Sequence, residues 1–250
     1  RSRPNVAEYS IRKTYGELLS QLENAFEKSD PLFILSMYYP YKYYIGDDSL
    51  IDPFEEGRQK QVVGLIRTLF LKRFESSVRA FELSSDRLMR KLLAFIEVNS
   101  QTEAEKKRLE VWKRRNAAIL DYTYHQQMDL WGNGAAEDEE EDVEEEETII
   151  DIEPLDRKDF KVDQIIQDSF QDLDQIIAFI QETKRFKPEN DDKLKKLIRL
   201  LNSKDLATKK VILFTEYADT ARYLKQQLTK NGIKGLEEVD GSTKRPRADI

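Results

Sequence analysis

Apolar residues recur at intervals of three or four positions along most of the first 200 residues of the chain. In the first such stretch, 8–28, they are Ile11, Tyr15, Leu18, Leu22 and Phe26. Side chains at this spacing share one face of an α-helix, which has about 3.6 residues per turn. The chain has only 9 Gly and 7 Pro among 250 residues, so few positions interrupt such helices. The sequence therefore predicts a mostly α fold.

The same spacing predicts five further helices, over 59–75, 78–95, 103–131, 165–180 and 192–201. Asn190, Asp191 and Asp192 stand at the start of the last one, and such residues cap a helix by accepting hydrogen bonds from its free N–H groups. The five tyrosines of residues 38–44 surround Pro40. They could form a stacking platform, but we expect them to pack around the proline.

A run of acids, EDEEEDVEEEE at 137–147, divides the chain. It holds ten of the 48 acids, so the formal charge of −7 becomes +3 outside it, with 41 bases against 38 acids. Like charges repel and the run has one apolar residue, which predicts an acidic, disordered linker over 136–148. We expect a helical region at 1–135, a helical connector at 149–205 and a different domain at 206–250.

The residue types exclude several kinds of site. Cysteine is absent and His125 is the single histidine, which excludes disulfides and leaves no His-based metal cluster. No apolar run approaches the roughly 18 residues of a membrane span. No apolar signal-peptide core follows Arg1. We therefore expect no metal site and no membrane partner, in a cytoplasmic protein.

The pattern changes after Lys209. Val211–Phe214 is a run of four apolar residues, which is typical of a strand buried on both faces. A helix at 218–230 follows, with a stop at Asn231-Gly232, and 236–239 offers a second strand. Strand, helix and strand within about 30 residues form a βαβ unit with parallel strands. The predicted fold class is mostly α, with a C-terminal α/β portion.

The ends of the two predicted strands carry polar residues that suit an anion. Parallel strands end at the same sheet edge, which brings Thr215 and Glu216 close to Asp240-Gly241-Ser242-Thr243. A helix is predicted to begin near Pro246, and its N-terminal amides can hold a phosphate. Arg245 and Arg247 add positive charge. A plain glycine turn with a helix cap is the alternative interpretation.

Two segments together resemble a known family. KKVILFTEYADTARYLKQQL (209–228) and GIKGLEEVDGSTKRPRADI (232–250) are similar to the opening of the second RecA-like lobe of superfamily-2 helicases, in the Swi/Snf-type branch and its bacterial relatives. DKLKKLIRLL (192–201) resembles the helix that leads into this lobe, and GLIRTLFLKRFESSVRAF (64–81) a basic segment that follows the first lobe. The likeness covers just under a third of the chain.

The resemblance implies an ATP-dependent motor that steps along nucleic acid, DNA in the first place. Thr215, Glu216, Ser242, Thr243 and Arg247 would then contact the nucleic-acid backbone, with Lys72 and Arg73 in secondary contacts. The chain has no GxxxxGK(S/T) phosphate loop and no DExx motif. ATP and magnesium would therefore bind a first RecA-like lobe elsewhere in the same polypeptide, and no catalytic residue is expected in this chain. It begins with Arg1 and stops at Ile250 where a new element starts, so we expect an internal fragment.

Other interpretations stay open at this point. The basic run KKRLEVWKRR (106–115) could track a nucleic-acid strand with Trp112 stacked on a base, although a solvated helix face with a core tryptophan is simpler. His125 is most simply an ordinary helix residue. The whole chain could also be a non-catalytic helical protein-interaction module. A phosphate-binding enzyme of another α/β type has less support, because no nucleophile and base are arranged around Ser242.

Overall fold

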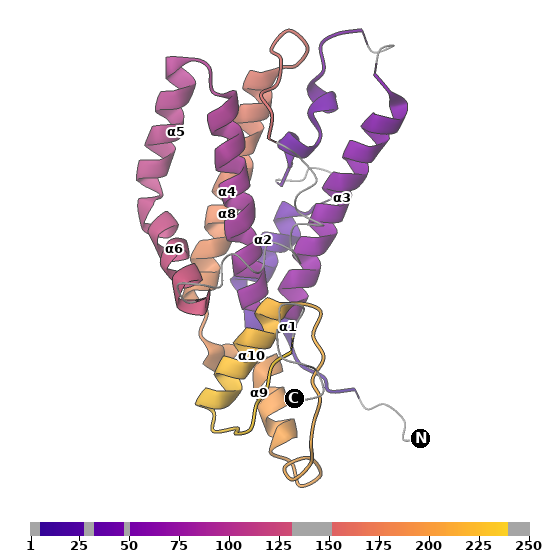
Figure 1. The fold of residues 1–250 in the computed structure, drawn as a ribbon, viewed down its shortest axis with the longest axis vertical. Helices are drawn as coiled ribbons and strands as arrows, with labels where there is room; N and C mark the ends of the chain where they lie inside the picture. The colour runs from indigo at the N-terminus through magenta and orange to yellow at the C-terminus, as the bar shows by residue number, and fades with distance from the viewer. Residues whose placement is uncertain (1–5, 28–32, 48–50, 132–151, 240–250) are drawn as a thin grey trace.

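The computed structural model describes residues 6–27, 33–47, 51–131 and 152–239, and most of these residues are helical. Three long helices run side by side along the molecule: α3 (Pro53–Ser76), α4 (Val78–Asn99) and α8 (Val162–Arg185) (Figure 1). The shorter α-helices are α1 (Ile11–Tyr15), α2 (Glu17–Ala25), α5 (Glu103–Arg115), α6 (Ala117–Trp131), α9 (Asp192–Leu201) and α10 (Ala218–Lys230). The mostly α character of the predicted fold is confirmed.

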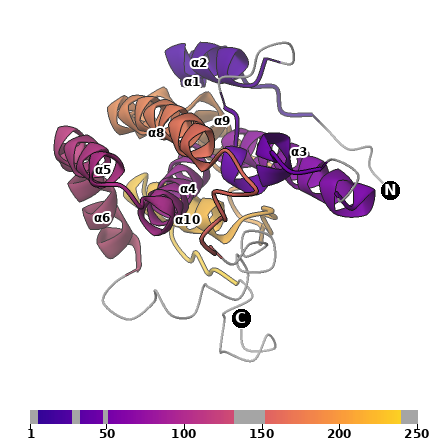
Figure 2. The same ribbon diagram turned by 90° about the horizontal axis from the view of Figure 1, so that it is seen from above.

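The long helices form a bundle around α4 and α8, whose contact is the most extensive between any two elements described. Figure 2 shows α2 on the outer side of α8, α5 and α6 beyond α4 and α8, and α3 on the opposite side. At one end of the bundle, α1 contacts α9 and α10 contacts α4 (Figure 1). Short 3-10 helices, η1 (Ser36–Tyr38), η2 (Pro40–Tyr43) and η5 (Pro188–Asn190), complete the described helices.

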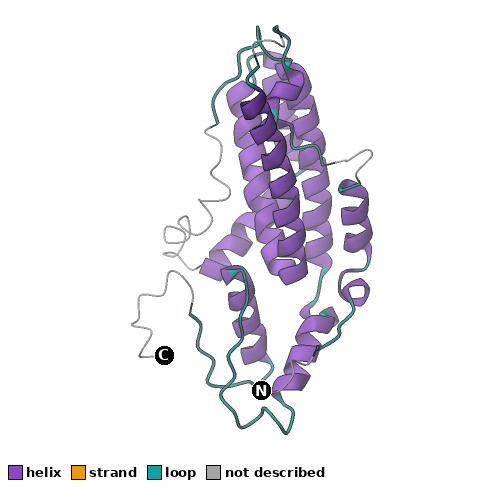
Figure 3. Ribbon diagram, turned by 90° about the vertical axis from the view of Figure 1, so that its right-hand side faces the viewer, coloured by secondary structure: helices purple, strands orange, loops and turns teal. Residues whose placement is uncertain are grey.

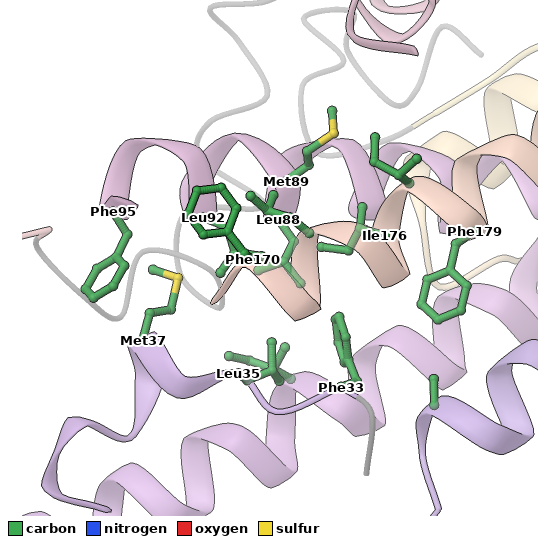
Figure 4. Packing of buried hydrophobic residues seen from close by; sticks show 14 of the residues in the cluster. Phe33, Leu35, Met37, Leu88, Met89, Leu92, Phe95, Phe170, Ile176 and Phe179 are labelled. Carbon is green, nitrogen blue, oxygen red and sulfur yellow. The ribbon is translucent and has the colours of Figure 1, made fainter. Parts of the chain in front are cut away.

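Aromatic rings fill the bundle core. Phe81 of α4 lies with its ring centroid 5.8 Å from that of Phe70, 5.5 Å from Phe74 and 5.6 Å from Phe179. Phe33 reaches the same group from the segment before η1 (Figure 4). Each ring fully removed from water contributes roughly 1.5–3 kcal/mol, so this group is a major source of bundle stability.

One buried carboxylate fixes the segment before η1 to α8. Asp172 accepts hydrogen bonds from the backbone N–H groups of Ile34 (2.6 Å) and Leu35 (2.7 Å). Leu35 has a φ of 59°, a left-handed conformation that is costly for a leucine. Burial raises the pKa of Asp172 to about 7, with Asp168 raising it further and Arg67 and the two N–H groups lowering it.

The tyrosines around Pro40 pack against the protein, as expected, with Tyr38 and Tyr43 buried.

Several helix starts follow from their capping residues. Ser77 caps α4 by accepting from the N–H of Ala80 at 3.1 Å. Thr102 and Glu105 form a reciprocal capping box at the start of α5. The predicted helices at 78–95, 192–201 and 218–230 are confirmed as α4, α9 and α10.

Two predicted helices are interrupted. The stretch 8–28 breaks at Gly16, whose φ of 50° lies in the region that favours glycine and separates α1 from α2. The stretch 103–131 breaks at Asn116, whose side-chain amide donates to the carbonyl of Trp112 at 3.0 Å and so competes with the continuing helix. In both stretches the apolar spacing continues across the break and conceals it.

The predicted βαβ unit is absent from the described residues. Its helix is present as α10, but 211–214 and 236–239 are irregular and do not pair with each other, and Figure 3 shows only helices and loops in the described part. Ile212 is 77% exposed and Phe214 is 93% exposed, so this run is not a buried strand here. A strand buried on both faces needs neighbouring strands and covering helices. The part of the chain described supplies neither.

A second, smaller apolar cluster joins α9 to α10. Its buried members are Leu194, Tyr223 and Leu228. α10 ends as predicted at Asn231-Gly232: Gly232 has a φ of 82°, and the N–H of Ile233 donates to the carbonyl of Leu228 at 3.0 Å. That geometry is a Schellman motif, and it turns Ile233 back onto the small cluster. The predicted acidic linker, 136–148, lies outside the described residues.

Candidate functional site

The C-terminal end of α3 meets the segment that leads into α10. The Nζ of Lys72 lies 3.1 Å from Oε1 of Glu216, although the two residues are 144 positions apart. Both side chains are about half exposed, so this ion pair faces solvent. Lys72 and Glu216 were predicted as site residues from separate segments, and the fold brings them together.

Arg73, the second predicted base, is buried beneath this pair. Its guanidinium lies 3.6 Å from Oδ2 of Asp219 and 4.6 Å from the centre of the Tyr217 ring. Arg87 of α4 and Arg222 of α10 approach the same carboxylate at 3.5 and 3.8 Å. Asp219 lies in the first turn of α10, where a negative charge is favourable to the helix dipole. Arg73 therefore fixes α10 to the bundle and does not face a nucleic acid in this arrangement.

Hydroxyl groups extend the junction beside Asp219. The Oγ1 of Thr220 lies 2.7 Å from Oγ of Ser76 and 2.9 Å from Oγ of Ser77, at the turn between α3 and α4. Lys193 of α9 donates to the last carbonyls of α3, those of Glu75 and Ser76, both at 3.0 Å. A cation at a helix C-terminus is favourable, while burial lowers the pKa of Lys193.

A cavity of about 260 Å³ opens between α1, α9, α10 and the segment that contains Thr215. Tyr15, Tyr223 and Asp191 form its polar wall, and leucines of α9 and α10 its apolar one. Tyr223 donates to Oδ2 of Asp191 at 2.9 Å, and burial raises the pKa of this tyrosine. Thr215 borders the cavity and is exposed, and Lys193 and Lys196 line the same cavity.

The remaining predicted residues cannot be placed. Ser242, Thr243 and Arg247 lie outside the described residues. The predicted sheet edge that would bring them to Thr215 is not formed in the described residues, because both of its strands, 211–214 and 236–239, are irregular.

The secondary candidates have ordinary structural roles. Trp112 is buried and donates from Nε1 to Asp174 at 2.8 Å, so it is not a stacking platform. His125 is exposed on α6 with Asp121 3.5 Å away. Among the described residues no group of three His, Cys, Asp or Glu side chains is placed to hold a metal ion. None of the helices in the described ranges combines the length and apolar character needed to cross a membrane.

The sequence did not point to Asp219, Arg87 or Arg222. Asp219 has one readable signal, its position in the first turn of a predicted helix. Which bases of α3 and α4 meet this acid, more than 130 residues away, depends on the packing of α4 and α10. A single sequence does not contain that information.

A comparison of the chain with protein-family models, with curated proteins and with solved structures finds no match.

Proposed function

We propose that the chain is part of an ATP-driven nucleic-acid helicase or translocase of superfamily 2, in the Swi/Snf-type branch. It supplies the helices between two RecA-like lobes and the beginning of the second lobe. The phosphate loop and the magnesium ligands belong to a first lobe in the same polypeptide, so the chain alone does not hydrolyse ATP. The partner is nucleic acid, DNA in the first place, in the cytoplasm.

The proposal is carried by the contact between Lys72 and Glu216. These residues come from the two segments that resemble the motor family, at 64–81 and 209–228, and the fold joins them at 3.1 Å. Arg73 and Asp219, both buried, join the same segments beside this pair. A chance likeness of two unconnected segments gives no reason for them to meet.

The exposed apolar run at 211–214 supports the same proposal. Phe214 and Ile212 are largely in water, which is unfavourable for side chains of this size. In a complete second lobe, further strands would pair with this run and cover it. Thr215, Ser242 and Thr243 would then hold a phosphate backbone at the sheet edge, with Arg247 and Lys72 beside them.

A second candidate is a non-catalytic helical interaction module. It is favoured by the continuous core of the bundle, which involves α2, α3, α4 and α8 and does not depend on the α10 segment. Such a module would have no use for the phosphate contacts proposed for Thr215, Ser242, Thr243 and Arg247.

The test is ATP hydrolysis by the polypeptide extended on both sides. We expect a phosphate-loop lobe before Arg1, an arginine-finger segment after Ile250, and hydrolysis that nucleic acid stimulates. The chain of 250 residues assayed alone should be inactive. An extended polypeptide that lacks a phosphate loop would end the motor proposal and leave the interaction module.

A further inference from the structure

The exposed side of α9 and the turn after it carry an excess of positive charge. Residues 191–210 contain seven bases and three acids. Two of the acids are engaged elsewhere: Asp191 accepts from the N–H of Leu194 and from Tyr223, and Asp192 accepts from the N–H of Ser10 at 2.8 Å. The surface that remains is formed mainly by lysine and arginine, namely Lys195, Lys196, Arg199, Lys204, Lys209 and Lys210, all exposed.

The bases on α9 are neighbours of one another. Lys195 and Arg199 are four positions apart, and Lys196 and Arg199 are three apart, so their side chains lie next to each other on the helix surface. Like charges at these spacings are unfavourable for the helix. Within the described part of the chain, none of these three side chains has an ion pair or hydrogen bond to an acid. Within the described residues, the three bases thus repel one another without an ion pair that offsets the repulsion.

The basic helix α5 differs in this respect. Lys106 pairs with Glu103 and Lys113 with Glu97, at 3.5 and 3.3 Å. Arg115 lies 2.7 Å from Asp174 of α8. Three of the α5 bases, Lys106, Lys113 and Arg115, are therefore paired with acids, which is the ordinary role of charges on a solvated helix face.

We propose that the exposed basic face of α9, centred on Lys195, Lys196 and Arg199, binds the phosphate backbone of a nucleic acid. This inference rests on the proposed function and adds a contact surface outside the predicted sheet-edge residues. The three bases are spread over about 6 Å of helix axis, and Lys204, Lys209 and Lys210 follow in the sequence. Lys196 also borders the cavity beside α9, whereas Lys195 and Arg199 are not among the residues that line it. A row of exposed charges suits an extended polyanion better than a single small anion, because each base can meet a different phosphate.

The test compares two triple variants of equal charge. One replaces Lys195, Lys196 and Arg199 by Gln, and the other replaces Lys106, Lys113 and Arg115 of α5, which are paired with acids, by Gln. Each removes three positive charges, and Gln is a good helix former, so circular dichroism should show both variants folded. Binding to a fluorescent duplex DNA of mixed sequence is followed by anisotropy between 50 and 200 mM salt.

We expect the α9 variant to bind roughly tenfold more weakly or worse, and its log-log salt slope to fall by about 2–3, as for three lost phosphate contacts. The α5 variant should change affinity less than about twofold, a residual long-range effect. A single-stranded oligonucleotide serves as a second probe, and polyglutamate is added as a competitor.

Three results would overturn the inference. Equal weakening in both variants would reveal a general charge effect, and no weakening in the α9 variant would place the contact elsewhere, while the motor proposal would stand in both cases. Competition by polyglutamate as strong as by the oligonucleotide would identify an acidic protein as the partner. If the unaltered chain binds neither DNA probe even at 50 mM salt, the α9 surface and the proposed nucleic-acid contacts fall together.

Discussion

The core of the helical bundle and the junction with α10 are held by different interactions. In the core, rings such as Phe81, Phe33 and Phe179 are fully buried against one another. At the junction, Asp219 meets three guanidinium groups and Thr220 meets two serine hydroxyls. The free energy of apolar burial depends little on how the buried groups are oriented or on moderate salt. The strength of an ion pair depends on its geometry, on its exposure to solvent and on the charges nearby. The junction is therefore the part of the molecule that solution conditions can loosen first.

The largest effect is expected from Phe81→Ala in the core. Removing the ring leaves a cavity between Phe70, Phe74 and Phe179, which should lower the free energy of unfolding by about 3–5 kcal/mol. Urea denaturation followed by circular dichroism measures it. Phe54→Ala is the matched control, because that ring is 77% exposed, and should change stability by less than about 0.5 kcal/mol. Equal losses in the two variants would contradict the assignment of the core.

A smaller and more local effect is expected from Asp219→Asn at the junction. The change removes the charge of the carboxylate that the buried Arg73 and the partly buried Arg87 and Arg222 share, which should weaken the docking of α10 by about 2–3 kcal/mol. This loss of free energy is at or below the low end of the range for breaking a buried ion pair, because the N–O distances at Asp219, 3.5–3.8 Å, are long.

Hydrogen exchange of the α10 amides measures this docking. Exchange should accelerate in α10 and stay unchanged in α4 and α8. Asp205→Asn, at an exposed position, is the control. Acceleration spread evenly over all helices would show that the junction and the core unfold as one unit.

The sequence predicts the core much better than the junction. The repeated apolar spacing specifies α4 and α8, and capping residues such as Ser77 place a helix start. The breaks at Gly16 and Asn116 escape prediction because one glycine or asparagine does not disturb that spacing. Apolar spacing and capping residues lie within each helix or next to it, so these helices can be predicted from the sequence of the segment alone.

Long-range features are beyond such an argument. The run at 211–214 has the composition of a buried strand, yet whether it becomes one depends on neighbouring strands that the described residues do not supply. The resemblance to a motor family singled out Lys72 and Arg73, and the structure then separates them, one exposed and one buried. Neither resemblance nor spacing revealed Asp219, whose role depends on the angle at which α10 meets α4.

Asp172→Asn tests a polar contact inside the apolar core. The asparagine amide has one oxygen that can accept a hydrogen bond and one NH2 group that cannot, so one of the backbone N–H groups of Ile34 and Leu35 loses its acceptor. At pH 5 this should lower the free energy of unfolding by about 1–2 kcal/mol. Burial raises the pKa of Asp172 from 3.8 to about 7, so the folded chain holds this proton more tightly than the unfolded chain. The stability from Asp172 is therefore fully present below about pH 4 and is lost as the pH rises through 7.

Urea midpoints between pH 4 and 8 measure this dependence. The unaltered chain should lose stability across that window, and the difference between it and the Asn variant should narrow as the pH rises. Asp205→Asn again serves as the control and should keep the slope of the unaltered chain. A difference that widens with pH would mean that Asp172 is preferentially ionised in the fold.

The smallest effect is expected at the exposed edge of the junction, between Lys72 and Glu216. A double-mutant cycle with Lys72→Gln and Glu216→Gln, read from α10 hydrogen exchange, should give a coupling of a few tenths of a kcal/mol that disappears in 0.5 M salt. The reason is that both side chains are about half in water, where an ion pair gains little. The buried pair of Arg73 and Asp219 fixes α10 instead. A coupling above about 1 kcal/mol would show that the exposed pair also fixes α10. Lys72 and Arg73 would then both contribute to the docking of α10, although only Arg73 is buried.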